Sequence, residues 1–209
     1  MFEAEKQEII KYAKIAGQKN LSPSVSGNIS VRCGENIVIT STGSANAFLE
    51  EDDISVIDFS GNLVSGVKKA SSEKYVHIEV YKKRPDINAI CHFHSPYLTA
   101  FAAAGLELGE YVLPEIVFMF EKIPLAEYAL PGTVDLANKT AQYFDNYDVV
   151  LMRNHGVISG GVDLKDAYLK LELCESYAQT YLLSKFLGGA KILSDEQVKE
   201  IFDLKTQVK

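Results

Sequence analysis

The chain has 209 residues, of which 47% are hydrophobic and 23% charged. This balance is typical of a folded globular protein and excludes an intrinsically disordered chain. The formal net charge is −7 at pH 7, and the largest basic cluster is only Lys82-Lys83-Arg84, so nucleic acid is not expected as a partner. No repeat or long Pro/Gly/Ser-rich linker divides the sequence, which predicts a single domain over residues 1–209.

The sequence also predicts a cytoplasmic protein with no membrane association. The first six residues are acidic and lack an apolar core, unlike a secretory signal. Residues 87–106 contain no Asp, Glu, Lys or Arg, but two histidines, an asparagine and a proline lie among them, which argues against a membrane span. The three cysteines are widely spaced and form no CxxC motif, as expected of reduced thiols.

Hydrophobic periodicity and turn residues predict the elements of the fold. In chain order we expect a helix over 3–18, strands over 29–32, 37–40 and 55–58, a helix over 72–84, a buried strand over 87–93, a helix over 96–104, strands over 115–119 and 123–127, a helix over 132–144, strands over 149–152 and 157–159, a helix over 163–187 and a last short helix from 194. Helices mixed with antiparallel strands predict a layered α/β/α fold around a central, mainly antiparallel sheet.

Three of the four histidines stand where a metal ion could be bound. His92 and His94 are two residues apart on a predicted strand, so both rings point to the same face. His155 follows an apolar strand and precedes Gly156, in a turn that can present its ring to a cleft. Three imidazoles with a vacant fourth position suit a catalytic zinc ion, although for the HxH pair alone two buried, hydrogen-bonded histidines are an equally good interpretation. The fourth, His77, is expected to be a packed or capping residue.

Three small polar segments are candidates for an anion-binding pocket. They are Ser26-Gly27-Asn28, Thr40–Ser44 and Ser71-Ser72-Glu73. The third stands at a predicted helix start, where free backbone N–H groups attract phosphate. Spacing alone favours Glu73 as a carboxylate that stabilises the helix N-terminus, with a catalytic base or metal ligand as the alternative.

Taken together, five segments resemble the signature of the class II aldolase/adducin family. They are Ser26–Arg32, Thr40–Gly43, Ser71–Glu73, His92–Ser95 and Asn154–Gly156, in this order and spacing. The resemblance extends from about residue 3 to about residue 200, and the combination is far more specific than any one segment.

The resemblance implies a zinc-dependent aldolase, a carbon–carbon lyase of carbohydrate metabolism. It would reversibly cleave a ketose 1-phosphate, such as fuculose 1-phosphate, to dihydroxyacetone phosphate and an aldehyde through a zinc-stabilised enediolate. Family members form fourfold-symmetric tetramers, so a homotetramer is expected. Carried over by residue, the resemblance implies one Zn2+ per subunit on His92, His94 and His155, Glu73 as base and occasional fourth ligand, and a phosphate site made by Gly27, Asn28, Thr42, Gly43, Ser71 and Ser72.

The chain departs from the family pattern on the aldehyde side of the site. Phe118 stands where aldolases of the family have a proton-donating tyrosine, and the tail lacks the expected tyrosine. Tyr111, Glu115 and Tyr128 are candidate replacement acids. Alternative functions are therefore a family epimerase, dehydratase or decarboxylase, or a non-catalytic adducin-like scaffold, and another divalent metal could replace zinc. The segment 114–124 lacks the aspartate and tyrosine that family epimerases use, which disfavours epimerisation.

Overall fold

The structure, a computed structural model, describes residues 2–208. Their strands form one eight-stranded sheet in the order β4-β3-β2-β1-β5-β8-β7-β6. All neighbouring strands are antiparallel except β6 and β7, which are parallel. The strands are β1 (Asn28–Cys33), β2 (Asn36–Thr40), β3 (Ile54–Asp58), β4 (Leu63–Ser65), β5 (Ala89–Phe93), β6 (Leu125–Ala126), β7 (Val149–Met152) and β8 (Gly156–Gly161).

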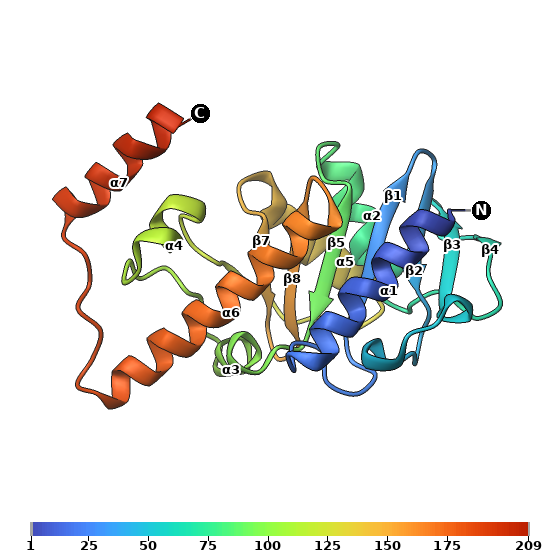
Figure 1. The fold of residues 1–209 in the computed structure, drawn as a ribbon, viewed down its shortest axis with the longest axis horizontal. Helices are drawn as coiled ribbons and strands as arrows, with labels where there is room; N and C mark the ends of the chain where they lie inside the picture. The colour runs from blue at the N-terminus through green and yellow to red at the C-terminus, as the bar shows by residue number, and fades with distance from the viewer. Residues whose placement is uncertain (1, 209) are drawn as a thin grey trace.

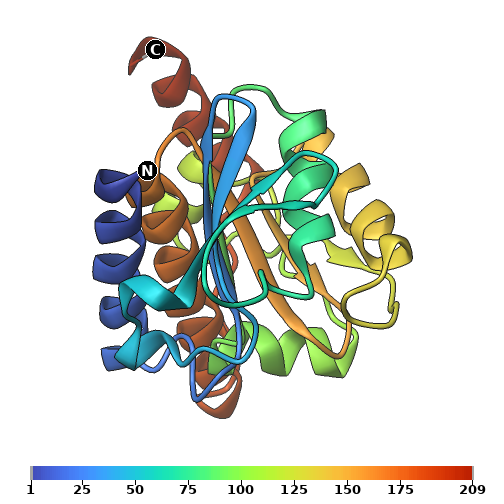
Figure 2. The ribbon, with the colours of Figure 1, turned by 90° about the vertical axis from the view of Figure 1, so that its right-hand side faces the viewer.

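Helices cover both faces of the sheet, as Figures 1 and 2 show. One face carries α1 (Glu3–Gln18) and α6 (Leu164–Phe186), and the other carries α2 (Lys74–Lys83) and α5 (Val134–Ala141). Helix α3 (Pro96–Ala104) lies at the lower ends of the strands in both views and contacts α6 and β8. Two further helices, α4 (Pro114–Met119) and α7 (Asp195–Val208), contact each other at the end of the molecule beyond β7 (Figure 1). Short 3-10 helices span Asn46–Phe48, Glu51–Asp53 and Gln142–Asp145.

The central strand β5 is buried on both faces and separates two hydrophobic cores. Cys91 and Phe93 belong to the core under α1 and α6, whereas Ile90 belongs to the core under α2 and α5. This alternation puts His92 on the side of α2, opposite to Cys91, as the sequence predicts. The predicted layered α/β/α architecture with a mainly antiparallel sheet is confirmed.

The largest disagreement between the predicted elements and the structure lies in the segment between α3 and β7, and strand β4 is not among the predicted elements. The strand predicted over 115–119 is wrong, because these residues lie in α4. Pro114 opens that helix, a position where its missing N–H is no loss, and a short apolar run does not by itself distinguish strand from helix. The strand predicted over 123–127 shrinks to β6, and the last helix is 14 residues long rather than short.

Two other sequence expectations concern the cysteines and the membrane. Cys33, Cys91 and Cys174 are all free, and the last two are buried. Within residues 2–208, no helix has the length and apolar character needed to cross a bilayer.

Candidate metal centre and phosphate pocket

Strand β5 positions the first two histidines of the candidate metal centre. His92 pairs with Asn28 of β1 on one side and with Ile158 of β8 on the other, so hydrogen-bonded strands hold its backbone from both sides. Its ring is 2% exposed, and Nδ1 donates a hydrogen bond of 2.9 Å to the carbonyl oxygen of Val157. That bond fixes the tautomer and leaves the Nε2 lone pair free to bind a cation. His94 follows the end of the strand and is half-buried.

The turn between β7 and β8 brings in the third histidine. Asn154 adopts a left-handed conformation with φ of 55°, and the N–H of His155 donates to the carbonyl oxygen of Met152. Gly156 then passes very close to β5: a Cβ atom there would lie 2.6 Å from the carbonyl oxygen of Phe93. A glycine is therefore required for this turn to approach the HxH pair.

The three rings surround one point. Their centroids are separated by 5.0 Å for His92 and His94, 4.8 Å for His92 and His155, and 4.9 Å for His94 and His155. One nitrogen from each ring lies within 4.8 Å of the other two. The Nε2 atoms of His92 and His94 are 3.3 Å apart, a separation at which two lone pairs repel unless a proton or a cation lies between them. The donor set therefore fits a divalent cation such as zinc.

Glu73 completes this cluster. Its Oε2 lies 3.1 Å from Nε2 of His92, and its Oε1 lies 3.0 Å from Nε2 of His155. Although Glu73 is the N-cap residue of α2, its side chain makes no capping hydrogen bond. The interpretation of Glu73 as a helix-capping carboxylate therefore does not describe its position, since the carboxylate is directed into the histidine cluster.

The titration of these groups reflects how closely they are packed. Burial raises the pKa of Glu73, but the charge of His92 and hydrogen bonds from His155 and His92 outweigh it, so the pKa lies well below its ordinary value. For His94, burial and the charges of His92 and His155 lower the pKa to about 3. Glu73 is thus ionised and His94 neutral near pH 7, as metal binding requires of these two groups, whereas His92 must give up the Nε2 hydrogen that it shares with Glu73 before that nitrogen can bind a cation.

The three polar segments singled out in the sequence meet beside the histidines. They line a cavity of about 270 Å3 that also contains Glu73, His94 and His155. Gly27 has φ of +80°, and a Cβ atom there would lie 2.5 Å from the carbonyl oxygen of His92, so only glycine lets this segment lie against β5. The candidate phosphate-binding residues in the lining are Gly27, Asn28, Thr42, Gly43, Ser71 and Ser72.

The sequence did not predict the contacts of Asn28 and His77, because the pairing of Asn28 with His92 is seen only in the structure. Nδ2 of Asn28 donates a hydrogen bond of 2.9 Å to Oε2 of Glu73, and Oδ1 accepts one of 2.5 Å from Nε2 of His77. His77 is fully buried, in agreement with its expected packed state. The one feature of the sequence that could have indicated a shared site is the spacing of Glu73 and His77, which lie one helical turn apart.

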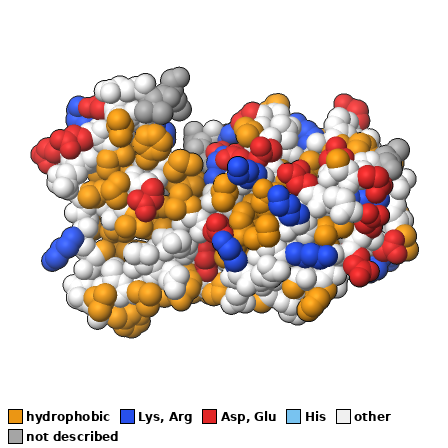
Figure 3. All heavy atoms as spheres, viewed as in Figure 1, with side chains coloured by type: hydrophobic (Ala, Val, Ile, Leu, Met, Phe, Trp, Pro, Cys, Tyr) orange, Lys and Arg blue, Asp and Glu red, His pale blue; other side chains and the backbone are white. Residues whose placement is uncertain are grey.

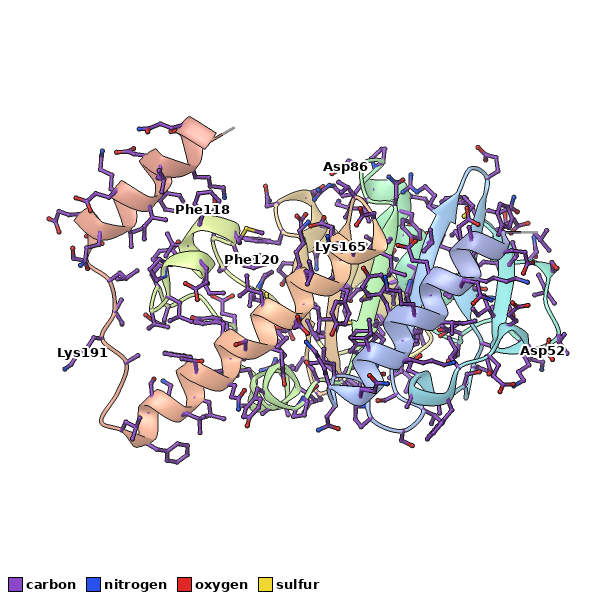
Figure 4. The ribbon with its side chains drawn as sticks, viewed as in Figure 1. Asp52, Asp86, Phe118, Phe120, Lys165 and Lys191 are labelled. Atoms are coloured by element: carbon purple, nitrogen blue, oxygen red, sulfur yellow. The ribbon has the colours of Figure 1, made fainter. Side chains whose placement is uncertain are left out.

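The candidate replacement acids lie away from this cavity. Among residues 2–208, the cavity lining includes none of Tyr111, Glu115 and Tyr128, and Tyr128 is 52% exposed. Phe118 lies on α4 beside α7 (Figure 4) and is also absent from the lining. Within residues 2–208, a single chain therefore brings together the candidate metal and phosphate residues, but none of the candidate acids.

Known proteins share this architecture and much of the sequence. The model of the Class II Aldolase and Adducin N-terminal domain matches residues 7–182. An L-fuculose phosphate aldolase from Methanocaldococcus jannaschii is 39% identical over 180 residues, which cover 86% of this chain and 97% of that protein. A 3-oxo-tetronate 4-phosphate decarboxylase from Haemophilus influenzae is 32% identical over 95% of this chain and 96% of its own length.

A solved structure titled L-fuculose 1-phosphate aldolase superposes with a TM-score of 0.89 at 34% identity. The match covers 96% of this chain and 95% of that one. The family model and the relatives cover nearly the whole eight-stranded sheet and all the segments that meet at the cavity. The chain therefore belongs to the class II aldolase and adducin family.

Proposed function

We propose that this protein is a zinc-dependent aldolase that reversibly cleaves a ketose 1-phosphate, of the fuculose 1-phosphate type, into dihydroxyacetone phosphate and an aldehyde. The observation that carries the proposal is the position of Glu73. Its ionised carboxylate contacts two of the three clustered histidines and opens into a cavity lined by hydroxyl groups and glycines. A base, a cation site and an anion pocket within one small cavity suit proton removal beside a substrate carbonyl.

In this proposal each group of the chain has a distinct part. His92, His94 and His155 hold the cation, and Glu73 is an occasional fourth ligand. When bound, the divalent cation supplies Lewis-acid stabilisation of the negative charge that develops on substrate oxygen atoms. Glu73 takes the proton from the carbon next to the carbonyl in the condensation direction and returns it in cleavage.

The phosphate-binding residues contribute orientation. The hydroxyl groups of Thr42, Ser71 and Ser72 and the backbone at Gly27 and Gly43 line the cavity beside Glu73. Because Ser71, Ser72 and Glu73 are consecutive, one helix start fixes both the phosphate anchor and the base. Binding energy from the phosphate, which is remote from the reacting carbons, then holds the substrate against the base.

The presence of all three histidines and Glu73 argues against a non-catalytic scaffold. A domain that only binds partners has no need for three converging histidines and a buried carboxylate, each of which is unfavourable to bury without a function. A decarboxylase remains the rival enzyme, because a relative with that name matches nearly the whole chain.

We further propose a cytoplasmic homotetramer in which each chain is a single domain. Hydrophobic side chains gather over α4, α7 and the end of α6 (Figure 3), and they include Met119, Phe186, Leu187 and Ile192 at 46–88% exposed. An apolar surface of this kind on a folded protein favours self-association. Light scattering after size-exclusion chromatography is expected to give four times the mass of one chain, and a monomer would contradict the assembly.

The proposed activity is tested with the purified, zinc-loaded protein. Fuculose 1-phosphate should yield dihydroxyacetone phosphate, a chelator should abolish the reaction, and zinc should restore it. Glu73→Gln should lower kcat by about 100-fold or more, whereas Glu79→Gln, on the outer side of the same helix, should not. Carbon dioxide release from a phosphorylated 3-oxo sugar acid without cleavage of ketose 1-phosphates would instead establish the decarboxylase, and metal-free protein at neutral pH would favour the scaffold.

A further inference from the structure

A buried chain of hydrogen bonds runs from Glu73 into the core between the sheet and α2. Beyond Asn28 and His77 it continues through Ser30 to Tyr81. The Oγ of Ser30 lies 2.7 Å from Nδ1 of His77 and 2.7 Å from the hydroxyl of Tyr81. All five side chains are at most 9% exposed, so water does not compete for these bonds.

The donors and acceptors of this chain can be assigned in one direction. The carboxylate of Glu73 only accepts, so Asn28 must present Nδ2 to it and Oδ1 to His77. Burial and the charge of His92 lower the pKa of His77 to about 3, so its ring is neutral. The Nε2 of His77 therefore carries the hydrogen donated to Asn28, and Nδ1 accepts from Ser30, whose oxygen accepts from Tyr81.

We propose that His77 is a positioning residue that acts through Asn28 to hold the Glu73 carboxylate in the orientation required of the base. This inference rests on the proposed function of Glu73. Without the hydrogen from His77, Oδ1 of Asn28 has no donor in the core, and the amide loses the second of the two bonds that fix its orientation. The amide can then turn away from the carboxylate, and Glu73 loses the hydrogen bond that holds it between His92 and His155.

Two substitutions of His77 separate positioning from packing. The side-chain nitrogen of Gln is the same number of bonds from the backbone as Nε2 of His, so His77→Gln keeps the donor to Asn28. The side chain of Asn extends only as far as Nδ1 of the histidine that it replaces. His77→Asn therefore keeps a hydrogen-bond partner for Ser30 and loses the donor to Asn28. We expect His77→Asn to lower kcat for fuculose 1-phosphate by about 10- to 100-fold with KM within about twofold of wild type, and His77→Gln to restore most of kcat.

Asn28→Ala supplies a double-mutant cycle. If His77 acts through Asn28, adding His77→Asn to Asn28→Ala should lower kcat by less than about twofold, since the pathway is already broken. Ile78→Ala, at a neighbouring buried position of α2, is the matched control: it should lower the midpoint of thermal unfolding and leave kcat unchanged. Equal kcat losses in His77→Gln and His77→Asn, or additive losses with Asn28→Ala, would overturn the proposal.

A crystal structure of His77→Asn gives a readout that does not depend on turnover. The proposal expects the distance from Nδ2 of Asn28 to Oε2 of Glu73, 2.9 Å in this structure, to exceed the hydrogen-bond limit of about 3.5 Å. An unchanged distance would refute positioning by His77. If the zinc-loaded wild-type protein did not cleave fuculose 1-phosphate, the aldolase proposal would be refuted. The distance between Asn28 and Glu73 in the variant would still test the positioning role of His77. Should His77→Asn fail to fold, Ser30→Ala, which frees the His77 tautomer, takes its place in both experiments.

Discussion

A buried carboxylate on α6 holds the turn that follows the HxH pair. Oε2 of Glu175 accepts hydrogen bonds of 2.8 Å from both the hydroxyl of Ser95 and the N–H of Leu98, and Oε1 accepts one of 2.9 Å from the N–H of Tyr97. Ser95 is the N-cap residue of α3, yet its own side chain makes no capping bond. Glu175, 80 residues away in sequence, therefore caps the helix that begins directly after His94.

Removal of these acceptors should destabilise the fold measurably. In Glu175→Gln one side-chain oxygen remains as an acceptor, and the amide N–H groups that replace the other oxygen face a donor of the α3 turn. That donor is left buried without an acceptor, which lowers the free energy of unfolding by about 1–3 kcal/mol. Glu175→Ala removes all three bonds and the favourable charge at the helix N-terminus. A groove lined in part by Tyr97, Glu175 and Gln179 adjoins these bonds. Because water can enter from it, we expect a loss of about 4 kcal/mol rather than the full sum. For a chain of this length that corresponds to about 8–16 °C in Tm.

Urea and thermal unfolding of zinc-free protein provide the assay. Glu172→Gln is the matched control on the same helix. It removes the ion pair with Lys19, which should cost less than about 1 kcal/mol, and the amide oxygen of Gln can still accept the hydrogen bond from the hydroxyl of Tyr168. Should Glu175→Ala be destabilised no more than Glu172→Gln, Glu175 would not be the cap of α3. A second consequence is weaker zinc binding by Glu175→Ala, since the backbone after His94 would no longer be held.

Three other predictions test the metal centre and the electrostatics. Excess zinc at about 100 times its Kd should add about 2.7 kcal/mol to stability and raise Tm by about 5–10 °C; a His155→Ala variant that showed the same shift would exclude this site. Gly156→Ala places a Cβ 2.6 Å from the backbone of Phe93 and 2.9 Å from the ring of His94. Calorimetric titration with zinc should therefore show binding weakened by at least about tenfold. An unchanged Kd would contradict the close packing of this turn against β5. For Asp53, burial is outweighed by hydrogen bonds from a lysine, a serine and a backbone amide, so its pKa is lowered on folding. The contribution of the Asp53 carboxylate to stability is therefore present above the pKa of the unfolded state and lost as the pH falls. In urea unfolding, Asp53→Asn should cost about 1 kcal/mol at pH 7 and almost nothing near pH 2. A stability difference that does not depend on pH would refute this role of Asp53.

Part of the candidate metal centre could be predicted because the information was local: the spacing of His92 and His94 on an apolar strand fixes their common face. The participation of His155, which lies far along the chain, followed from the family resemblance of the five segments, and the structure brings the three rings together. The helix over 3–18 and the helix over 96–104 were predicted with their observed bounds, the first because its hydrophobic periodicity ends before the segment 20–23 and the second because Pro96 marks its first turn.

What the sequence could not show depends on contacts between distant segments. The apolar residues of α4 fit a strand as well as a helix, and only packing against α7 and the core decides between them. Likewise, His77 has the pattern of an ordinary core residue, and its partners come from β1, 47 and 49 residues earlier. Hydrogen-bond partners at such separations leave no periodic signal in a single sequence.

The strand order explains why four of the five separate segments meet in one cavity. In the sheet, β2, β1, β5 and β8 are consecutive and antiparallel. Consequently the end of β2, the start of β1, the end of β5 and the start of β8 all lie at the same edge, and these are the positions of Thr42, Asn28, His94 and His155. A shift of one residue in the pairing of β1 with β5 would turn His92 to the opposite face of the sheet. Correct register, fixed by the buried alternation of β5, is therefore a precondition for the cation site as well as for the core.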